Sequence, residues 1–392
     1  MVEWKKLGEV VSYYRGVSYN KKQEVSLNSG GTKILRANNI TVETNTLNFD
    51  DVKEISSSVK IKEYQWLYPN DILICAGSGS KEHVGKVAYI YKTINYAYGG
   101  FMGKLVTSEA LIPRYFFHVI SSSLFKKYLD VALNATTINN LNAGLLNDFL
   151  IPIPSLEEQN RIVGILDTFT DSIENLKQQI AQRRKQFEFY RDQLLDLEGK
   201  EGVEMKTLGE ICDIKGDYGI SASSKPFDGN CRYIRITDIT DSGSLNDDVV
   251  SADYNKPVKE ALKEGDILFA RTGATVGKTL LFHKEYGECL FAGYLIRYRV
   301  KTMIALPKFV FHFAHSNDYY KWVKANLVEG AQPNISALKY NSLQIPVPPL
   351  SEQSRIVSIL DTFEASITNL EAQLAQRQKQ YEYYRNQLLT FE

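Results

Sequence analysis

The chain has 392 residues, 44% hydrophobic and 23% charged, which is typical of soluble globular proteins and predicts two or three domains. It has no run of about 18 uncharged apolar residues and no apolar signal peptide at its start, so secreted and membrane classes are excluded and a cytoplasmic protein is expected. The four cysteines lack a CxxC spacing, so neither a disulfide framework nor a zinc site is expected.

The net charge is zero, but the charge is unevenly distributed. Residues 1–150 carry 17 basic and 13 acidic side chains (+4), and residues 199–344 carry 19 and 18 (+1). Residues 151–198 carry 6 and 9 (−3), and residues 345–392 carry 4 and 6 (−2). Proteins that bind DNA usually have a surplus of lysine and arginine for phosphate contacts. A DNA-binding chain with so little positive charge is expected to share phosphate binding with partners.

The first globular region, residues 1–150, consists of short β-rich runs broken by glycine, serine and asparagine, with one helical stretch from Pro113 to Leu129. The second globular region, residues 199–344, follows the same order and has its helical stretch from Pro307 to Val323. Similarity between the two regions is weak and confined to short pieces. They are therefore predicted to share one α+β fold but to differ in surface.

Two helical repeats, residues 151–198 and 345–392, are related by an offset of 194 with 31 identities in 48 positions. Prolines at the start of each repeat keep the helix from beginning earlier. From Ile162 and from Ile356, apolar or aromatic residues recur every three or four positions, and ten of eleven seam positions fit this coiled-coil pattern in each repeat. We expect the two helices to pair antiparallel within one chain, each roughly 50 Å long along its seam.

The polar seam position is Arg183 in the first repeat and Arg377 in the second. A charge at this place can fix the register of the helices, or it can extend to water along the helix edge, and the sequence leaves both open. Ser155 and Glu158 have the spacing of a capping box at the start of the first helix.

No catalytic motif is found in the sequence. The loop from Gly273 to Thr279 has three residues between its glycines where a phosphate-binding Walker A loop has four, so it is interpreted either as a flexible loop that approaches DNA or as a structural hairpin turn. His118 and His312 follow phenylalanines at matching positions of the helical stretches, which favours a role in the core over metal binding. We therefore predict no catalytic residues and no metal-ligating residues.

Candidate DNA contacts are polar and basic residues in corresponding loops of the two globular regions, because arginine and lysine pair with guanine, and asparagine and glutamine with adenine. Solvated polar loops have the same composition, and Arg36 and Arg235 lie beside apolar strand residues, so a structural role stays open for each. The candidates are Arg36, Asn38, Asn39, Ser78, Ser80, Lys81, Lys86, Asn139, Asn140, Arg235, Asp238, Arg271, Thr272, Lys278, Gln332 and Asn334.

The order of globular region, helix, globular region, helix resembles the specificity subunits of type I restriction-modification systems over essentially all 392 residues. The resemblance is carried by the entry Ile-Pro-x-Pro-x-Leu-x-x-Gln-x-x-Ile-Val-x-Ile-Leu-Asp into each helix, preceded in the second half by Ile335-Ser336-Ala337-Leu338. It implies two target recognition domains, residues 1–150 and 199–344, that read the halves of a split, asymmetric DNA sequence. The helical repeats, residues 151–198 and 345–392, would set the spacing between them.

The same resemblance implies a non-catalytic subunit that works with partners: double-stranded DNA, two methyltransferase (modification) subunits and the restriction or translocase subunits. It also implies that this chain binds no cofactor, and that S-adenosylmethionine, ATP and Mg²⁺ belong to the partner subunits. A second hypothesis, a coiled-coil scaffold with two ligand-binding domains, is compatible with the same element order. Partner-dependent DNA binding limited by salt would distinguish the two.

Overall fold

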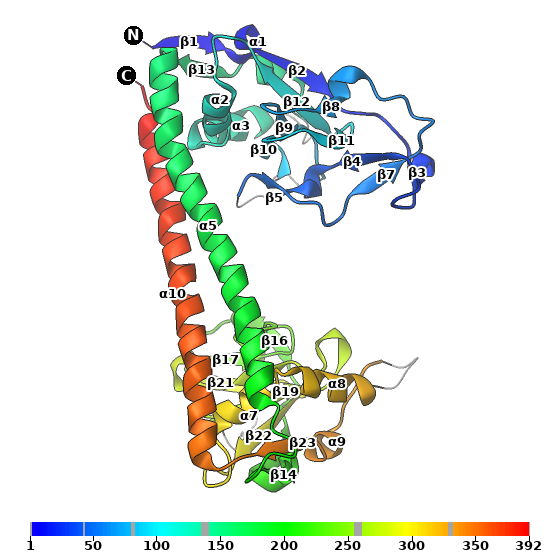
Figure 1. The fold of residues 1–392 in the computed structure, drawn as a ribbon, viewed down its shortest axis with the longest axis vertical. Helices are drawn as coiled ribbons and strands as arrows, with labels where there is room; N and C mark the ends of the chain where they lie inside the picture. Colours follow the sequence, from blue (N-terminus) through cyan, green and yellow to red (C-terminus); the bar gives the residue numbers. More distant parts are fainter. Residues whose placement is uncertain are drawn as a thin grey trace. The chain divides into compact units, whose positions relative to one another are not determined.

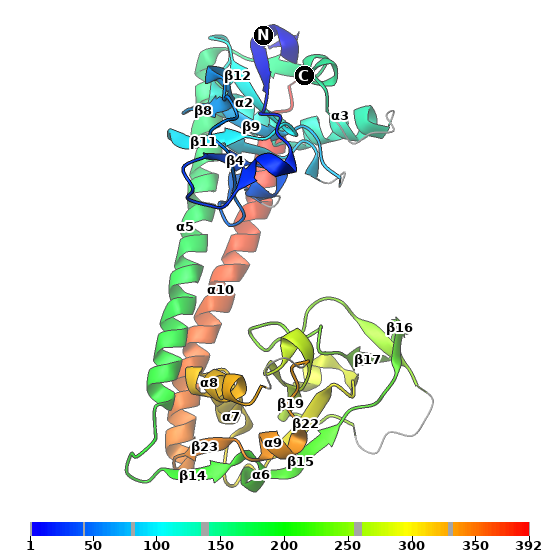
Figure 2. The same ribbon diagram turned by 90° about the vertical axis from the view of Figure 1, so that its right-hand side faces the viewer.

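The computed structural model describes residues 2–41, 44–79, 83–134, 141–254, 261–327 and 332–391. The chain forms two compact units (Figures 1 and 2). Unit 1 is Met1–Lys177 with Ala372–Glu392, and unit 2 is Gln178–Glu371. Each unit thus combines a globular region with one segment of each long helix. No described helix is both long enough and apolar enough to cross a membrane.

Unit 1 begins with a strand, and its globular region is followed by a long helix. Its elements are β1 (Glu3–Lys6), α1 (Leu7–Val10), β2 (Val11–Arg15), β3 (Glu24–Val25), β4 (Thr32–Leu35), β5 (Ile40–Thr41), β6 (Thr46–Leu47), β7 (Lys53–Ile55), β8 (Trp66–Leu67), β9 (Ile72–Cys75), β10 (Val87–Tyr89), β11 (Ile94–Tyr98), β12 (Met102–Thr107), α2 (Pro113–Ile120), α3 (Ser123–Asn134), α4 (Ala143–Asn147), β13 (Leu150–Ile153) and the first part of α5 (Leu156–Leu195).

Unit 2 repeats much of this order. Its elements are β14 (Glu204–Thr207), α6 (Leu208–Ile211), β15 (Cys212–Tyr218), β16 (Ser223–Pro226), β17 (Cys231–Ile234), β18 (Val250–Asp253), β19 (Asp266–Ala270), β20 (Thr279–Leu281), β21 (Glu288–Phe291), β22 (Leu295–Val300), α7 (Pro307–Phe313), α8 (Asn317–Ala325), α9 (Ala337–Asn341), β23 (Gln344–Val347) and the first part of α10 (Leu350–Leu388).

Three strand arrangements recur in both units. A four-stranded antiparallel sheet has the order β10-β9-β12-β2 in unit 1 and β20-β19-β22-β15 in unit 2. A parallel pair, β4 with β11 or β17 with β21, stands beside it in each unit. The first strand of each unit pairs with the strand that leads into a long helix, as β1 with β13 and β14 with β23. This pairing brings the start of each globular region to the start of the following helix.

The single helical stretch predicted in each globular region is wrong, because the structure breaks it into two helices. In unit 1 the break falls between α2 and α3, where the Ser122 hydroxyl accepts a hydrogen bond from the backbone of Leu124. In unit 2 it falls between α7 and α8, and Ser316 caps α8 by accepting from the Tyr319 N–H. Serine favours such caps because its hydroxyl satisfies an N–H at the helix start.

The long helices pair antiparallel within each unit, as predicted. In unit 1, Phe169 of α5 stacks on Tyr384 of α10 with ring centroids 5.3 Å apart. In unit 2, Tyr190 of α5 stacks on Phe363 of α10 at 5.4 Å. The offset of 194 exchanges these two pairs, since it relates residue 169 to 363 and 190 to 384. The duplicated sequence therefore makes the same contact twice with the roles of the helices reversed.

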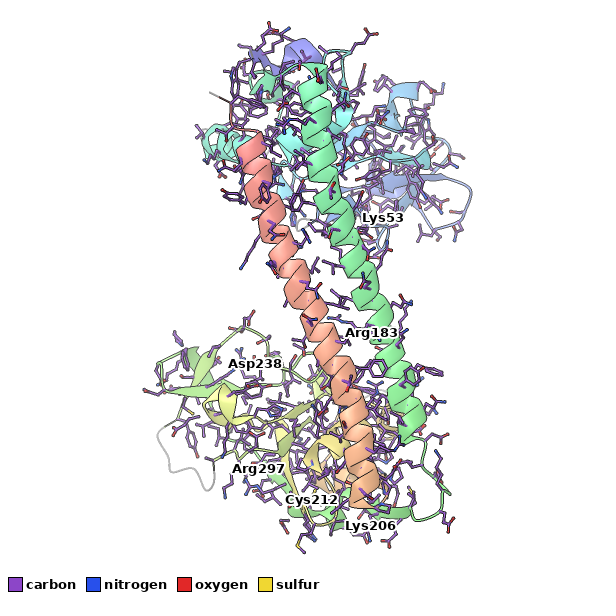
Figure 3. All side chains as sticks on the ribbon, turned by 60° about the vertical axis from the view of Figure 1, so that its left-hand side comes forward. Lys53, Arg183, Lys206, Cys212, Asp238 and Arg297 are labelled. Carbon is purple, nitrogen blue, oxygen red and sulfur yellow. The ribbon has the colours of Figure 1, made fainter. Side chains whose placement is uncertain are left out.

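The two seam arginines share one environment. The Arg377 guanidinium lies 5.7 Å from the Phe169 ring in unit 1, and that of Arg183 lies 5.8 Å from the Phe363 ring in unit 2 (Figure 3). Both side chains are half-buried. Each arginine thus covers an aromatic ring of the opposite helix in a cation–π contact, which differs from both a buried charge and an extension into water.

A buried glutamine joins each long helix to the globular region before it. The Gln159 carboxamide accepts from the Ile112 N–H at 2.8 Å and donates to the carbonyls of Ala110 and Pro154 at 3.0 and 2.9 Å. Gln353 makes the matching three bonds in unit 2 at 2.8, 3.0 and 2.8 Å. Both side chains are fully buried. This explains the glutamine in the repeated helix entry.

The predicted capping box at the start of α5 is present only in its first half. The Ser155 hydroxyl accepts from the Glu158 N–H at 3.3 Å. The Glu158 carboxylate, however, binds the Arg161 guanidinium at 2.7 and 2.6 Å. Glu158 therefore forms an ion pair one turn along the helix instead of the second capping-box bond, in which its carboxylate would accept from the Ser155 N–H.

His118 and His312 are buried, as their position beside core phenylalanines predicts. In unit 1, His118 Nε2 lies 2.9 Å from Asp167 Oδ1 and Nδ1 lies 3.0 Å from the Tyr381 hydroxyl. A neutral ring that donates from Nε2 and accepts at Nδ1 satisfies both contacts. Burial lowers the pKa of His118 to about 4, although Asp167 opposes the shift. The histidine therefore links α2 to both long helices in its neutral form.

We predict that replacing Gln159 with leucine lowers the free energy of unfolding by roughly 3–5 kcal/mol, because three backbone groups around the buried carboxamide lose their hydrogen-bond partner. Urea denaturation of the two proteins measures the difference. Gln182→Leu is the matched control, since Gln182 is exposed on α5 and its replacement should change stability by less than about 0.5 kcal/mol. Equal effects of the two substitutions would contradict the buried role of Gln159.

A second prediction concerns acid stability. The pKa of His118 falls from 6.5 to about 4 on folding, so between these pH values the unfolded chain binds more protons and the free energy of unfolding falls as the pH is lowered. The loss is on the order of 3 kcal/mol. Urea midpoints from pH 7 to pH 4 should fall less steeply in His118→Gln than in the parent. Gln182→Leu, at an exposed side chain of α5 that does not titrate, should keep the parent slope. A parent-like slope in His118→Gln would refute the argument.

Candidate nucleic-acid interface

The turn after β4 in unit 1 holds three of the predicted contacts, and one of them is structural. Asn39 is fully buried. Its carboxamide accepts from the Arg36 N–H at 2.9 Å and donates to the Asn48 carbonyl at 3.2 Å. The Arg36 guanidinium and the exposed Asn38 both bind the Asp51 carboxylate, at 2.7 and 3.1 Å. Asn39 therefore closes this turn, which favours a structural role, and DNA contact by Asn39 stays an untested prediction.

The turn after β17 in unit 2 repeats this arrangement with an acid in place of Asn39. Asp238, labelled in Figure 3, is fully buried and its carboxylate accepts from the Arg235 N–H at 2.8 Å. The Arg235 guanidinium binds Asp238 at 2.6 Å and Asp248 at 2.7 Å. These two ion pairs raise the pKa of Arg235. These contacts favour a structural role for Asp238 as well, and DNA contact by it stays an untested prediction.

Lys86 and Lys278 fasten these turns to the neighbouring hairpins. The Lys86 ammonium donates to the Ile40 carbonyl at 3.4 Å, and the Lys278 ammonium donates to the Ile239 carbonyl at 3.3 Å. Lys278 also pairs with Asp241 at 2.8 Å. Lys86 is only 9% exposed. The geometry thus supports a structural role for both lysines, and the loop from Gly273 to Thr279 is a hairpin turn that leads into β20 and not into a helix.

Four chain segments meet at one edge of each unit. In unit 1 the Gly99 N–H donates to the Leu35 carbonyl beside Arg36, at 2.9 Å, and the N–H groups of Ala76 and Gly77 donate to the Phe101 carbonyl, both at 2.9 Å. The Leu141 N–H donates to the Ala76 carbonyl at 2.6 Å, which ties in the segment before α4. Ser78, half-buried, follows this contact. We call this set of segments the recognition edge.

The recognition edge of unit 2 is built by the same bonds. The Ala292 N–H donates to the Ile234 carbonyl at 2.9 Å, the Arg271 N–H to the Tyr294 carbonyl at 3.0 Å, and the Ile335 N–H to the Arg271 carbonyl at 2.8 Å. Thr272 forms a β-bridge with Asn334. The predicted contacts of this half that stay accessible therefore lie together.

Exposed polar groups of the unit 2 edge surround Arg271. Its guanidinium stacks over the Tyr218 ring at 4.9 Å and donates to the Asn334 carboxamide at 3.2 Å. Gln332 and Asn334 are exposed, and Thr272 is half-buried. DNA contact by these residues stays a prediction, as it does for Arg36, Asn38, Ser78 and Arg235. Ser80, Lys81, Asn139 and Asn140 lie outside the described residues.

Two exposed aromatic residues at the recognition edges were missed by the sequence reasoning. Phe101 is 73% exposed in unit 1 and Tyr294 is 60% exposed in unit 2, each in the turn that precedes the central strand, β12 or β22. The repeated pattern Gly-Gly-Phe-Met and Ala-Gly-Tyr-Leu marks the position in both regions. Neither position carries a basic or amide side chain, so neither was among the predicted contacts.

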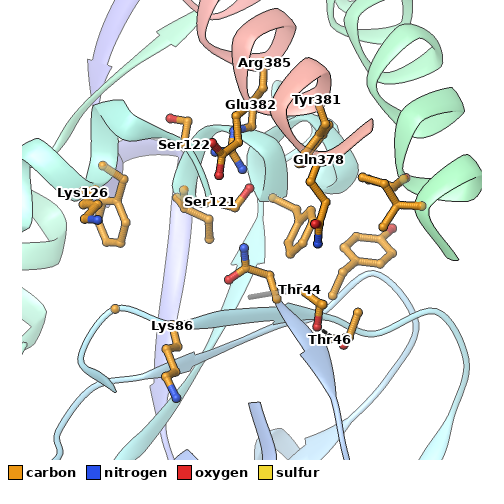
Figure 4. A pocket seen from close by; sticks show the side chains of 18 of the residues that line it. Thr44, Thr46, Lys86, Ser121, Ser122, Lys126, Gln378, Tyr381, Glu382 and Arg385 are labelled. Atoms are coloured by element: carbon orange, nitrogen blue, oxygen red, sulfur yellow. Dashed lines mark hydrogen bonds between the residues drawn. The ribbon is translucent and has the colours of Figure 1, made fainter. Parts of the chain in front are cut away.

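A cleft of about 1240 Å³ opens in unit 1 between the loop that bears Thr44 and Thr46 and the helices α2, α3 and α10 (Figure 4). Among its labelled side chains, Lys126 and Arg385 are basic and Glu382 is acidic. These groups do not form a convergent acid–base or metal-binding set, so we assign the cleft no ligand.

One histidine–carboxylate cluster in unit 2 has the residue types of a metal site. Ligand atoms of His312, Asp361 and Glu364 lie within 4.8 Å of one another. The Lys308 ammonium, however, is 2.6 Å from Asp361 and 3.0 Å from Glu364. It already supplies the positive charge that the two carboxylates require. The cluster is therefore interpreted as an ion-pair contact between α7 and α10, equivalent to that of His118 with α5.

The comparisons with known proteins agree with this duplicated architecture. The family described as Type I restriction modification DNA specificity domain matches residues 1–183 and again residues 200–378. The chain is 26% identical over 386 residues to the type I restriction enzyme StySPI specificity subunit of Salmonella potsdam, an alignment that covers 93% of this chain and 82% of that protein. It is 27% identical over 391 residues to the EcoKI specificity subunit of Escherichia coli K12, with the same coverage of both proteins.

A solved structure on the complex assembly and conformational transition of the type I R-M system contains a chain of similar fold. The superposition covers 99% of this chain and 96% of that chain, with a TM-score of 0.60 and 18% sequence identity. At this identity the likeness concerns the fold alone. The predicted fold class, two similar α+β regions each followed by a long helix, is confirmed.

We predict that Asn39→Ala and Asn38→Ala differ in their effect on stability. Asn39→Ala should lower the free energy of unfolding by about 2 kcal/mol, because two buried hydrogen bonds are lost and their backbone partners stay unsatisfied. Asn38→Ala, at an exposed side chain, should change stability by less than about 0.5 kcal/mol. Thermal unfolding of both variants measures the difference. A more destabilised Asn38→Ala protein would overturn the assignment.

Proposed function

The chain belongs to the type I restriction-modification DNA specificity family, and we propose that it reads a split, asymmetric DNA target, one half with each recognition edge. It is a non-catalytic specificity subunit. The observation that carries the proposal is that the two edges share one backbone framework and differ in side chains. Ala76 occupies in unit 1 the place that Arg271 takes in unit 2, since both carbonyls accept from the equivalent residues Leu141 and Ile335.

Different side chains on one framework are suited to reading different sequences. Arginine can donate two bonds to guanine, whereas Ala76 is buried and leaves the same place of the unit 1 edge without a side chain for a base. The shared framework holds each set of side chains at the same place on its unit. Phosphate contacts fix register without selecting sequence, so the differing residues are the ones expected to specify the two half-sites.

We further propose that two methyltransferase subunits and the restriction subunits dock on this chain, and that S-adenosylmethionine, ATP and Mg²⁺ are bound by those partners. Support for a paired partner comes from the outer faces of the long helices. Phe189 of α5 is 62% exposed and its repeat equivalent Tyr383 of α10 is 61% exposed. Exposed aromatic residues are enriched at protein interfaces, and duplicated ones suit a partner present twice. Since the DNA and these partners act together, the proposed location is the cytoplasm.

Exchange of residues 1–150 for the first region of another family member should change one half-site and leave the other intact. The readout is the map of methylated positions in cells that also produce the partner subunits. The reciprocal exchange of residues 199–344 is the matched control and should change the other half-site. If either exchange altered both half-sites, or if the parent modified a continuous palindrome, the proposal of two readers would fail.

The purified chain with S-adenosylmethionine alone should transfer no methyl group to DNA, because the proposed role is to direct a methyltransferase. Addition of the methyltransferase subunit should give methylation at the split target, measured by transfer of a radiolabelled methyl group. The methyltransferase subunit without this chain is the control. Methylation by the chain alone would contradict the proposed division of work.

A further inference from the structure

The exposed rings of Phe101 and Tyr294 stand at the same place in the two units. Phe101 is the third residue of a turn in which the Met102 N–H donates to the Gly99 carbonyl at 2.8 Å. Tyr294 is the third residue of the matching turn, where the Leu295 N–H donates to the Ala292 carbonyl at 2.8 Å. Both turns connect a parallel strand to the central strand of the antiparallel sheet. The fold therefore presents an aromatic ring at each recognition edge.

The turn that carries each ring is held from several sides. The Gly99 N–H donates to the Leu35 carbonyl of β4, and the Ala292 N–H donates to the Ile234 carbonyl of β17, both at 2.9 Å. The carbonyl of each aromatic residue accepts from the neighbouring segment, at 2.9 Å for Phe101 and 3.0 Å for Tyr294. A turn fixed by so many backbone bonds presents its side chain without the entropy that a mobile loop loses on binding.

Backbone fills the space close beneath each turn. A Cβ atom added at Gly16 would lie 2.2 Å from the Gly99 carbonyl oxygen, and one added at Gly219 would lie 2.2 Å from the Phe291 carbonyl oxygen and 2.3 Å from that of Ala292. Only glycine allows so close an approach of two backbones. Glycine at both positions shows that the close crossing is a shared feature of the two units.

Two apolar side chains that are even more exposed lack this duplication. Met303 is 88% exposed and Leu338 is 81% exposed, but the repeat places Glu109 and Gly144 at the equivalent positions. Isolated exposed apolar residues are common on protein surfaces and need no function. An aromatic ring present in both copies, at an edge where the neighbouring side chains differ, points to a role common to both half-sites.

We propose that Phe101 and Tyr294 each place their ring against bases of one half-site, in apolar contact with a thymine methyl group at the edge of a base pair. The inference rests on the proposed function, because it concerns how each recognition edge reads its half-site. Apolar contact with the thymine methyl group is an established mode of readout in double-stranded DNA, and phenylalanine is among the side chains that make it. Tyr294 adds a hydroxyl that Phe101 lacks, which gives the two edges different hydrogen-bonding capacity.

The test uses the chain assembled with its methyltransferase subunits and a duplex bearing the target mapped for the parent. Phe101→Ala and Tyr294→Ala should each weaken binding roughly five- to 150-fold, the range for losing recognition of one base pair. Met303→Ala is the matched control, since it removes an equally exposed apolar side chain from unit 2, and it should bind as the parent does. Thermal unfolding of each variant should match the parent, because these rings are exposed.

A base-substitution series identifies the half-site. At the base that Phe101 contacts, substitution should weaken binding by the parent but not by Phe101→Ala, and the same base should stay important for Tyr294→Ala. The second half-site should show the reverse pattern. The inference is overturned if both variants bind like the parent, or if their loss is equal on target and random DNA. A parent complex with no preference for any split sequence would instead refute the proposed function.

Discussion

The structure depends on the junction between each long helix and the globular region before it. Gln159 and Gln353 each bond their buried carboxamide to three backbone groups at this junction. In unit 1 the contact of His118 on α2 with Asp167 on α5 also joins the globular region to the helix. Buried polar networks of this kind are stable only when every member is satisfied. The junction therefore fixes the globular region on its helix at one angle.

The seam of the long helices continues into these junctions. Ile162 and Leu166 belong to the core of unit 1 together with Leu7, and Ile356 and Leu360 belong to the core of unit 2. The same seven-residue repeat thus serves two purposes along its length, with aromatic stacking between helices farther along and burial in a globular core at the start. A coiled-coil pattern predicts an apolar surface, but it does not say which partner will cover it.

Much of the fold could be predicted from the sequence because the duplication reveals the order of the elements. The helix entries, the α+β class and the pairing of α5 with α10 all follow from the repeat. The helical stretches were misjudged because Ser122 and Ser316 act as caps within an apolar run, and serine is compatible with either a helix interior or a cap. The candidate contacts were harder, since Asn38 and Asn39 are adjacent identical residues of which one is exposed and the other closes the turn.

The pairing of basic residues at the recognition edges bears on how tightly this chain can hold DNA. Arg36 binds Asp51, Arg235 binds Asp238 and Asp248, and Lys278 binds Asp241. A phosphate that approaches these groups must compete with carboxylates already in place, so the gain from each contact is reduced. Because counterion release supplies most sequence-independent affinity, a chain of zero net charge gains little from it. Under the proposed function, base contacts would then contribute a larger share of its binding, and the proposed partner subunits would supply the remaining phosphate affinity.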